Sequence, residues 1–488
     1  MKKINCFIIG SEIEEAKISA KNLQTSALIN KIFLLSKSDV NEIIEGCEII
    51  KADSASSTQT TKLISEKSDA DFTLIYTKNS PLETGQFAME RMMRIAEDTG
   101  AGMVYADYYE IKNEIRSAHP VIDYQEGSLR DDFNFGPVLL YNSSTLKKAV
   151  ANMTENYQFA GLYDLRLKVS QLAPLVHINE YLYTTVETDT RKSGEKQFDY
   201  VDPRNRAVQI EMEAACTDHL KQIGGFLAPE FKSIEFSESN FPVEASVIIP
   251  VKNRAKTIGD AIQSVLMQKT AFPFNLIIID NYSTDGTTDL IRKFAGSDNR
   301  VIHIIPERKD LGIGGCWNEG VHDSRCGKFA VQLDSDDVYQ DENTMQKIVD
   351  AFYEQNCAMV VGSYTMTNFV METIPPGLID HKEWTPENGR NNALRINGLG
   401  APRAFYTPVL RDIKVPNTSY GEDYALGLRI SREYQIGRIY ESVYLCRRWD
   451  ENSDAALDVV KMNGHNLYKD KIRTIELMAR KKKNTPNP

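Results

Sequence analysis

Three carboxylates lie within four positions of the stretch VQLDSDDVYQDEN, residues 331–343, directly behind a short apolar run. Like charges this close repel each other, so Asp334, Asp336 and Asp337 need a compensating partner. Two interpretations stay open from the residues alone. The carboxylates can cap a following helix by accepting its free N–H groups. Alternatively, Asp334 and Asp336 can offer hard oxygen ligands to Mg²⁺ or Mn²⁺ and leave room for a diphosphate.

A second acidic pair, Glu422 and Asp423, opens the stretch SYGEDYALGLRISREY (419–434), which has the apolar spacing of an amphipathic helix. Acids in the first turn of a helix interact favourably with its dipole. The same position suits a general base, because a carboxylate near a substrate hydroxyl can remove its proton as the oxygen attacks. Both interpretations stay open at this point.

Two further segments combine polar residues and glycines. Asp280, in IDNYSTDGT (279–287), can belong to a polar turn or accept hydrogen bonds from a nucleobase or ribose. The glycines of KDLGIGGCWNEG (309–320), Gly312 first among them, can let the backbone approach a ligand closely. This second segment lacks the G-x-G-x-x-G fingerprint of dinucleotide-binding folds.

Four apolar runs must position these groups, and none of them alternates between polar and apolar residues: SVIIPV (246–251), NLIIID (275–280), VIHII (301–305) and KFAVQL (328–333). Such runs are typical of parallel strands that are covered by helices on both faces. Helical stretches between them predict a doubly wound α/β unit, in which ligands bind beyond the carboxyl ends of the strands. We therefore expect Pro250–Asn253, Asp280–Asp285 and Asp334–Asp337 at one rim of the sheet.

The first half of the chain repeats this order of elements weakly. ADFTLIYTKNSPLE lines up with GKFAVQLDSDDVYQ, and GLYDLRLKVS lines up with GEDYALGLRIS. A repeat this long predicts a duplicated domain, although unrelated α/β domains can share such patterns. The predicted divisions are a first domain (1–222), a linker (223–243), a second domain (244–455) and a C-terminal helix with a basic tail (456–488). We expect the end of that tail, ARKKKNTPNP, to be frayed.

Composition excludes some classes of function. The chain has 488 residues, of which 42% are hydrophobic and 26% charged, and a net charge of −11, which argues against nucleic-acid binding. Its seven scattered cysteines form no CxxC pair and predict free thiols in a reducing compartment. We expect a cytoplasmic protein that meets any lipid-linked substrate at the inner face of the membrane. Peripheral membrane contact through the basic tail and a homo-oligomer stay open.

Taken in order, five motifs resemble those of family 2 glycosyltransferases with the GT-A fold: SVIIPVKN, LIIIDNYSTDGT, LGIGGCWNEG, VQLDSDD and GEDYALGLR. The resemblance covers about residues 244–455. It implies a GT-A-type, Rossmann-like, mostly parallel sheet flanked by helices, here duplicated with a divergent N-terminal copy. It also implies a hexosyltransferase that moves one sugar from a UDP- or GDP-sugar to a hydroxyl, with inversion and with Mn²⁺ or Mg²⁺. The implied acceptor is a glycan or lipid-linked glycan in polysaccharide or glycoconjugate assembly.

The resemblance also assigns roles by position. It implies donor contacts from Pro250, Val251, Asn253, Asp280, Gly312, Asp334 and Ser335. Asp336 and Asp334 form the implied D-x-D metal pair, Asp423 is the implied base and Glu422 its neighbour. Asn281 and the Cys316–Asn318 segment depart from the family pattern, which puts the usual arginine contact to the donor in doubt. RRWDENS lacks the Gln of processive synthases and therefore favours transfer of a single sugar.

Two alternatives are a catalytically inactive nucleotide-sugar or glycan-binding protein and a nucleotidyltransferase. The latter would favour a glycine-rich triphosphate loop, but no glycine lies between Pro250 and Thr257.

In the first half, Tyr76–Asn79 replace the acidic cluster. Leu162 or Tyr163 occupies the base position, unless a one-residue gap restores Asp164. We expect this half to be catalytically silent and to serve as a packing partner, an acceptor-binding surface or an oligomerisation face. His381 and His465 could complete a metal shell, but surface or core roles are expected for both.

Overall fold

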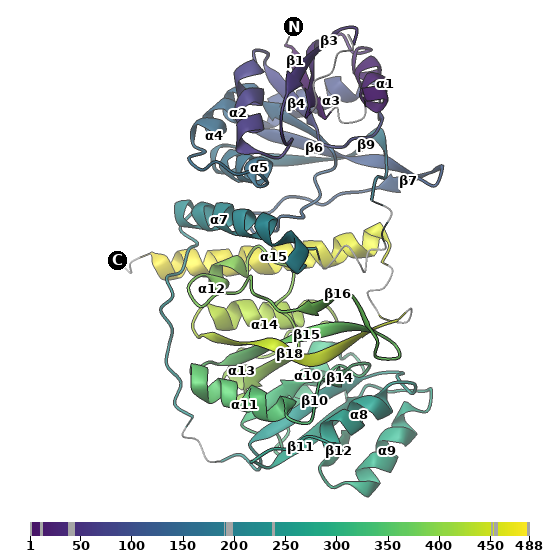
Figure 1. Ribbon diagram of the computed structural model, residues 1–488, viewed down its shortest axis with the longest axis vertical. Helices are drawn as coiled ribbons and strands as arrows, with labels where there is room; N and C mark the ends of the chain where they lie inside the picture. The colour runs from purple at the N-terminus through teal and green to yellow at the C-terminus, as the bar shows by residue number, and fades with distance from the viewer. Residues whose placement is uncertain are drawn as a thin grey trace.

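The computed structural model of the chain describes residues 2–9, 13–37, 44–189, 191, 199–236, 240–449, 452 and 457–485. Residues 237–239 of the predicted linker, most of the DENS segment and residues 486–488 of the basic tail lie outside the described residues. Figure 1 shows two α/β halves stacked along the long axis of the molecule, with two helices running crosswise between them.

The second half is built on one mixed sheet. Its strands are β10 (Ala245–Val251), β11 (Phe274–Asp280), β12 (Val301–Ile304), β13 (Phe329–Gln332), β14 (Val338–Tyr339), β15 (Met359–Asn368), β16 (Thr373–Ile379), β17 (Arg403–Tyr406) and β18 (Ile436–Arg448). Its helices are α8 (Ile258–Leu266), α9 (Thr287–Ser297), α10 (Ile313–His322), α11 (Thr344–Gln355), α12 (Gly389–Asn392), α13 (Thr407–Ile413) and α14 (Glu422–Ser431). The four apolar runs coincide with β10 to β13, which confirms these predicted strands.

The first half contains its own sheet. Its strands are β1 (Ile4–Ile9), β2 (Ile29–Ser36), β3 (Cys47–Lys51), β4 (Phe72–Tyr76), β5 (Leu82–Thr84), β6 (Met103–Lys112), β7 (Ile115–His119), β8 (Val138–Asn142) and β9 (Leu175–Val186). Its helices are α1 (Ile13–Leu23), α2 (Thr58–Lys67), α3 (Ala88–Thr99), α4 (Ser143–Ala151) and α5 (Gly161–Leu172), followed by the short η1 (Pro203–Asn205) and by α7 (Arg206–Gln222).

The two sheets have the same strand order. The second sheet runs β12-β11-β10-β13-β17-β15-β18-β14 with β16 beside β15, and the first runs β3-β2-β1-β4-β8-β6-β9-β5 with β7 beside β6. Each strand of one sheet therefore has a counterpart in the other, which confirms the predicted duplication. The sheets are mixed, and the expectation of mostly parallel strands was too simple. The strand β17 runs antiparallel to both β13 and β15, because the chain returns through the sheet after the parallel βαβ part.

The parallel part forms because its strands are apolar on both faces. Every residue of β11 is buried, and in β10 only Pro250 is partly exposed. Helices must then cover both faces of the sheet to exclude water from it. The hydrophobic core of the second half continues into the first through Leu129, Tyr163 and Leu220. An apolar core that crosses between the halves fixes them against each other.

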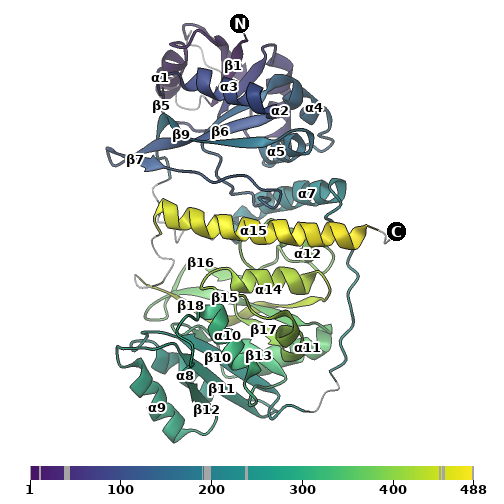
Figure 2. The same cartoon turned by 180° about the vertical axis from the view of Figure 1, so that it is seen from behind.

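A long helix, α15 (Val459–Asn484), lies between the halves, beside α7 on one side and α14 and α12 on the other (Figures 1 and 2). Its inward face carries buried charges: Asp470 accepts hydrogen bonds from Arg473 and from Ser128 of the first half. The prediction that the tail 479–488 is frayed is wrong for its first residues. Arg480 is fully buried and donates to Glu476, and the helix continues to Asn484.

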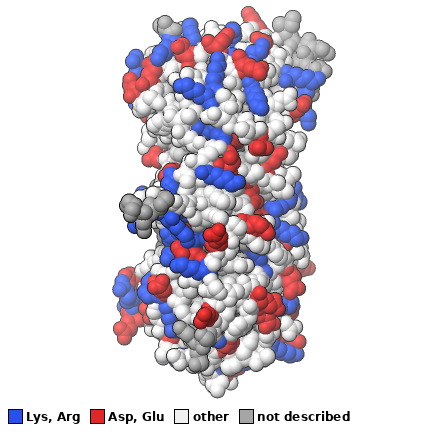
Figure 3. Space-filling model, turned by 90° about the vertical axis from the view of Figure 1, so that its left-hand side faces the viewer, with Lys and Arg blue, Asp and Glu red and all other residues white. Residues whose placement is uncertain are grey.

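Charges of both signs are interspersed on the face of the molecule seen in Figure 3, over both halves. None of the helices in the described parts of the chain is long and apolar enough to cross a membrane.

Candidate active site

A cavity of about 900 Å³ opens at the carboxyl-end rim of the second sheet and reaches the first half of the chain. Six predicted site residues line it: Pro250, Asp334, Ser335, Asp336, Glu422 and Asp423. The first half contributes Asp131, Asp132, Tyr200, Gln209 and Met212, among others. The structure therefore brings the acidic cluster and the Glu-Asp pair together, and it adds a wall that the sequence motifs did not indicate.

Helix capping does not account for the acidic cluster. Residues 334–337 lead into the short strand β14, and α11 begins only at Thr344, with Asn343 as its N-cap. Asp337 instead accepts a hydrogen bond of 2.7 Å from the backbone N–H of Arg447. Asp334 accepts one of 2.8 Å from the Gln332 amide. These carboxylates thus accept hydrogen bonds at the rim of the sheet and do not cap a helix.

The crowding of these acids is visible in their pKa values. Burial and the charge of Asp336 raise the pKa of Asp334, and the nearby Arg403 offsets only part of this effect. Burial, followed by the charges of Asp336 and Asp334, raises the pKa of Asp337 well above its usual range. A cluster whose members oppose one another's ionisation is stabilised by an added cation. The hard oxygen donors of Asp334 and Asp336 therefore fit Mn²⁺ or Mg²⁺.

Protein cations surround the cluster without fully neutralising it. The Arg254 Nε lies 3.8 Å from Asp336 Oδ2. Arg447 is buried, pairs with Asp260 at 2.8 Å and donates to the backbone carbonyl of Asp336. Neither arginine makes a close bidentate pair with a cluster carboxylate. Among the described residues, no three His, Cys, Asp or Glu side chains converge as a ready-made metal site.

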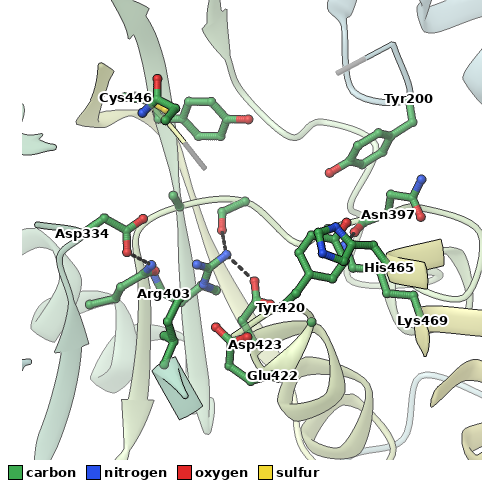
Figure 4. Close-up of a pocket in the computed structure, with 18 of the residues that line it drawn as sticks. Tyr200, Asp334, Asn397, Arg403, Tyr420, Glu422, Asp423, Cys446, His465 and Lys469 are labelled. Carbon is green, nitrogen blue, oxygen red and sulfur yellow. Dashed lines mark hydrogen bonds and ion pairs between the residues drawn. The ribbon is translucent and has the colours of Figure 1, made fainter. Parts of the chain in front are cut away.

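The Glu-Asp pair begins α14, directly after Gly421, whose φ of 77° places it in the left-handed region that glycine tolerates best. Asp423 Oδ2 lies 2.6 Å from Arg403 Nη1 (Figure 4). Burial opposes ionisation of Asp423, but Arg403 and then Lys469 outweigh it and hold the pKa of Asp423 below its usual range. Asp423 is therefore a carboxylate near neutral pH.

The pKa of the neighbouring Glu422 is shifted in the opposite direction from that of Asp423. Burial, followed by the charge of Asp423, raises the pKa of Glu422 to about 8. Its Oε2 is buried and has no hydrogen-bond partner in the described structure. Two adjacent carboxyl groups thus have their pKa values pushed apart, a pattern that is typical of active sites.

Four other predicted donor contacts lie outside the cavity lining. Val251 and Asp280 are buried, and Asp280 accepts hydrogen bonds from the Ser283 N–H and the Thr288 hydroxyl. Asn253 is exposed and organises the same turn by accepting the Thr284 N–H. Gly312 is the fourth predicted donor contact outside the cavity lining. The donor roles of these residues stay predictions.

The glycine segment at the start of α10 approaches protein backbone. A Cβ atom built on Gly314 would lie 1.8 Å from the carbonyl oxygen of Pro416, and one on Gly312 would lie 2.7 Å from the carbonyl carbon of Thr418. These positions need glycine because the segment that leads into α14 packs directly against them. The glycines therefore have a packing role that positions Glu422 and Asp423, and their expected role toward a ligand stays a prediction.

Several cavity residues were not indicated by the sequence motifs. Arg403 is the first residue of β17, and because this strand is antiparallel to β13, its start lies where β13 ends. From α15, His465 and Lys469 reach the cavity. The half-buried His465 ring stacks on Tyr420 with a centroid distance of 3.8 Å, and its expected surface or core role stays a prediction. His381, in contrast, is buried and pairs with Glu383.

The rim of the first sheet has different chemistry at the position of the acidic cluster. β4 and β13 are in the same register, since Phe72 and Phe329 both lie opposite the first residue of the central strand. This register matches Thr77–Ser80 to Asp334–Asp337, one residue later than expected from the sequence. Lys78 lies within this segment, and its Nζ is 2.8 Å from Glu110 Oε1.

The base position of the first half is also changed. The hydroxyls of Tyr163 and Tyr424 each donate to a backbone carbonyl in the segment before the equivalent strand, β8 or β17. Matching these tyrosines places Leu162 at the position of Asp423. Asp164 is buried beside Lys168, and burial raises the pKa of Asp164 to about 6.

Comparisons with known proteins agree with the motifs. Residues 246–406 match the family model described as glycosyl transferase family 2, which confirms the predicted resemblance over that segment. The chain is 30% identical over 128 residues to the putative teichuronic acid biosynthesis glycosyltransferase TuaG of Bacillus subtilis (strain 168), covering 26% of this chain and 49% of that protein. It is 28% identical over 299 residues to an uncharacterized glycosyltransferase of Rickettsia felis, covering 57% of this chain and 48% of that protein.

Among solved structures, S. aureus TarS 1–349 in complex with UDP aligns with a TM-score of 0.37 and 21% sequence identity, over 48% of this chain and 65% of that chain. The chain spans about half the length of the two curated relatives. The family match ends before Glu422 and Asp423, so the roles of these two residues stay predictions.

Proposed function

We propose that the chain is a glycosyltransferase that moves one sugar from a nucleotide-sugar donor to a hydroxyl of an acceptor, with inversion at the sugar carbon. The observation that carries the proposal is the shared cavity. It joins Asp334 and Asp336, which follow β13, to Asp423 at the start of α14. The family match of residues 246–406 supports the same activity.

The donor end of the cavity is the acidic cluster. Asp336 and Asp334 would hold Mn²⁺ or Mg²⁺, with Ser335 and Pro250 beside the nucleotide of a UDP- or GDP-sugar. When bound, the metal ion supplies Lewis-acid stabilisation of the charge on the leaving diphosphate. Arg254 lies beside Asp336 and can add to this stabilisation, because a cation near the developing charge lowers its energy.

The acceptor oxygen attacks the anomeric carbon as its proton passes to Asp423. A new bond forms between that carbon and the acceptor oxygen, and the bond from the carbon to the phosphate oxygen breaks. The bonding electron pair leaves with the nucleoside diphosphate. Asp423 suits this role because it is deprotonated and lies in the same cavity as the acidic cluster. The ion pair between Arg403 and Asp423 must weaken or break in this step, because the acceptor hydroxyl has to reach the Asp423 carboxylate.

The pathway proposal is an assembly step of a polysaccharide or glycoconjugate, with a glycan or lipid-linked glycan as acceptor. It is supported by the similarity to a relative whose name refers to teichuronic acid biosynthesis. Within this proposal the second domain (244–455) carries the chemistry. The first domain (1–222) is catalytically silent, which is supported by Lys78 in the position of the acidic cluster and its ion pair with Glu110.

The test is to incubate the full chain with a panel of nucleotide sugars and Mn²⁺ and to measure released nucleoside diphosphate and transferred sugar. Asp423→Asn should lower turnover by at least about a hundredfold, as expected for loss of a general base. Its matched control is Asp289→Asn, at an exposed acid on α9. Release of pyrophosphate would instead indicate a nucleotidyltransferase, and binding without turnover a non-catalytic protein. Full turnover by Asp423→Asn would refute the base assignment.

A further inference from the structure

The cavity continues past Asp423 to an end that holds none of the proposed donor contacts. Figure 4 shows Asp334 on one side, Tyr200, Asn397 and His465 on the other, and Asp423 between them. Electrostatics agree with this arrangement. The charges of Asp423 and Asp334 both act on Arg403, and burial, followed by the charges of Glu383, Tyr420 and Asp423, raises the pKa of Tyr200.

We propose that this far end, formed jointly by the first half, the loop after α12 and helix α15, is the acceptor subsite and that it takes an uncharged sugar. The inference rests on the proposed glycosyl transfer, and it gives the first half a specific part in substrate recognition. A cavity of about 900 Å³ is large enough for a nucleotide sugar and an additional sugar ring.

Two polar side chains at this end are available to a ligand. Tyr200 lines the cavity, and its hydroxyl makes no hydrogen bond to another described residue. Neither ring nitrogen of His465 has such a partner, and Nδ1 is buried, so Nε2 is left to meet a ligand. Burial, followed by the charges of Lys461 and Lys469, lowers the pKa of His465. A neutral imidazole and a phenol can each donate to or accept from a sugar hydroxyl.

The charge of the walls favours an uncharged acceptor. The described lining residues of the first half include Asp131, Asp132 and Asp199 but no Lys or Arg. Lys469, on the opposite wall, is buried and occupied: its Nζ donates to the Asn397 carbonyl at 2.6 Å and lies 4.5 Å from the Tyr420 ring centre. These three carboxylates are already ion-paired, Asp131 with Arg395, Asp132 with Arg130 and Asp199 with Arg191. A phosphate would therefore find no arginine at this wall that lacks a carboxylate partner among the described residues, whereas the hydroxyls of an uncharged sugar need no counter-charge.

The experiment uses the full chain with Mn²⁺ and whichever nucleotide sugar it hydrolyses. Two acceptor classes are compared: p-nitrophenyl hexosides, which are uncharged, and hexose 6-phosphates. The variants are Tyr200→Phe, which removes one hydroxyl, and His465→Phe, which keeps a ring against Tyr420. Tyr181→Phe is the matched control, since Tyr181 is exposed on β9 and lies outside the cavity lining. The measured quantity is the ratio of sugar transfer to donor hydrolysis.

We expect transfer to a hexoside, and a fall of about tenfold in its ratio to hydrolysis in each cavity variant, the effect of losing one hydrogen bond to substrate. The control should keep the parent ratio. An unchanged ratio in both cavity variants, transfer to none of the hexosides, or transfer to the phosphates alone would each overturn the subsite. If the parent chain hydrolyses no nucleotide sugar, the proposed function itself fails first, and the subsite fails with it.

Discussion

The Nη1 atom of Arg403 lies 2.6 Å from Oδ2 of Asp423, so the proposed base is ion-paired. The same guanidinium also stabilises the charge of Asp334. One arginine thus links the proposed metal pair to the proposed base. Movement of Arg403 toward either carboxylate changes the basicity of the other.

The first prediction concerns the pH dependence of catalysis. Arg403 holds the pKa of Asp423 low, so Arg403→Gln should raise this pKa. Because a protonated Asp423 cannot accept the acceptor's proton, the acidic limb of the kcat/KM profile should move to higher pH. The profile is measured from diphosphate release, with the exposed Arg292→Gln as control. An acidic limb that stays in place would show that Arg403 does not tune the base.

Metal binding can be tested without measuring activity. Asp336→Asn removes one charged oxygen donor from the acidic cluster and should weaken Mn²⁺ binding by about tenfold or more. Mn²⁺ binding is followed by electron paramagnetic resonance of the free ion. Asp341→Asn is the matched control, because Asp341 lies on the same segment but pairs with Lys347. Equal Mn²⁺ affinity of the parent and Asp336→Asn would show that Asp336 is not a metal ligand.

Helix α15 should contribute strongly to stability through Asp470. This fully buried carboxylate accepts from Arg473 at 2.8 Å, and Arg130 Nε lies 3.4 Å away. Asp470→Ala leaves two buried guanidinium groups short of a partner and should lower the free energy of unfolding by about 3–5 kcal/mol. Urea denaturation measures the loss. Lys471→Ala, at an exposed position of the same helix, should change it by about 0.5 kcal/mol at most.

The first half should carry an acid-sensitive site at His219. Burial, followed by the charges of Arg166 and Lys168, lowers the pKa of His219 from 6.5 to about 3. The unfolded chain therefore binds a proton that the folded chain does not, and stability falls as pH decreases from about 6.5 toward 3. Relative to about pH 7.5, the loss from this group is about 2 kcal/mol near pH 5.

His219→Gln should remove this share of the acid sensitivity while retaining a polar group near Gln171. The measurement is urea denaturation at both pH values, and the exposed His322→Gln serves as control. An identical pH dependence in parent and His219→Gln would contradict the assignment.

Much of the fold could be predicted from local patterns. The strands β10 to β13 coincide with apolar runs because a strand buried on both faces needs apolar residues at every position. The duplication was also predictable, since the two halves keep the same order of runs and turns. The mixed character of the sheets was not, because the direction of β17 depends on how the chain returns through the sheet and not on its own composition.

The site was predictable only where it lies on motifs. Asp334, Asp336 and Asp423 follow strands or begin helices, and their positions at the rim follow from the order of elements. Arg403 reaches them only because its strand is antiparallel, and His465 only because α15 packs between the halves. Such residues depend on long-range packing, which one sequence does not reveal. The one-residue misplacement of Thr77–Ser80 has a simpler cause: register is set by strand pairing.

The position of helix α15 near the end of the given sequence also affects the order in which parts of the chain can fold. A chain is synthesised from its N-terminus, and its domains generally fold as they emerge from the ribosome. The first sheet can therefore form before residues 459–484 emerge, whereas the second sheet needs β18 (Ile436–Arg448), which emerges shortly before them. The wall that holds His465 and Lys469, and the buried charges that join the halves, must wait for this last helix. Until α15 is in place, the cavity beside the acidic cluster lacks this wall, so the addition of α15 is the step that closes the cavity on that side.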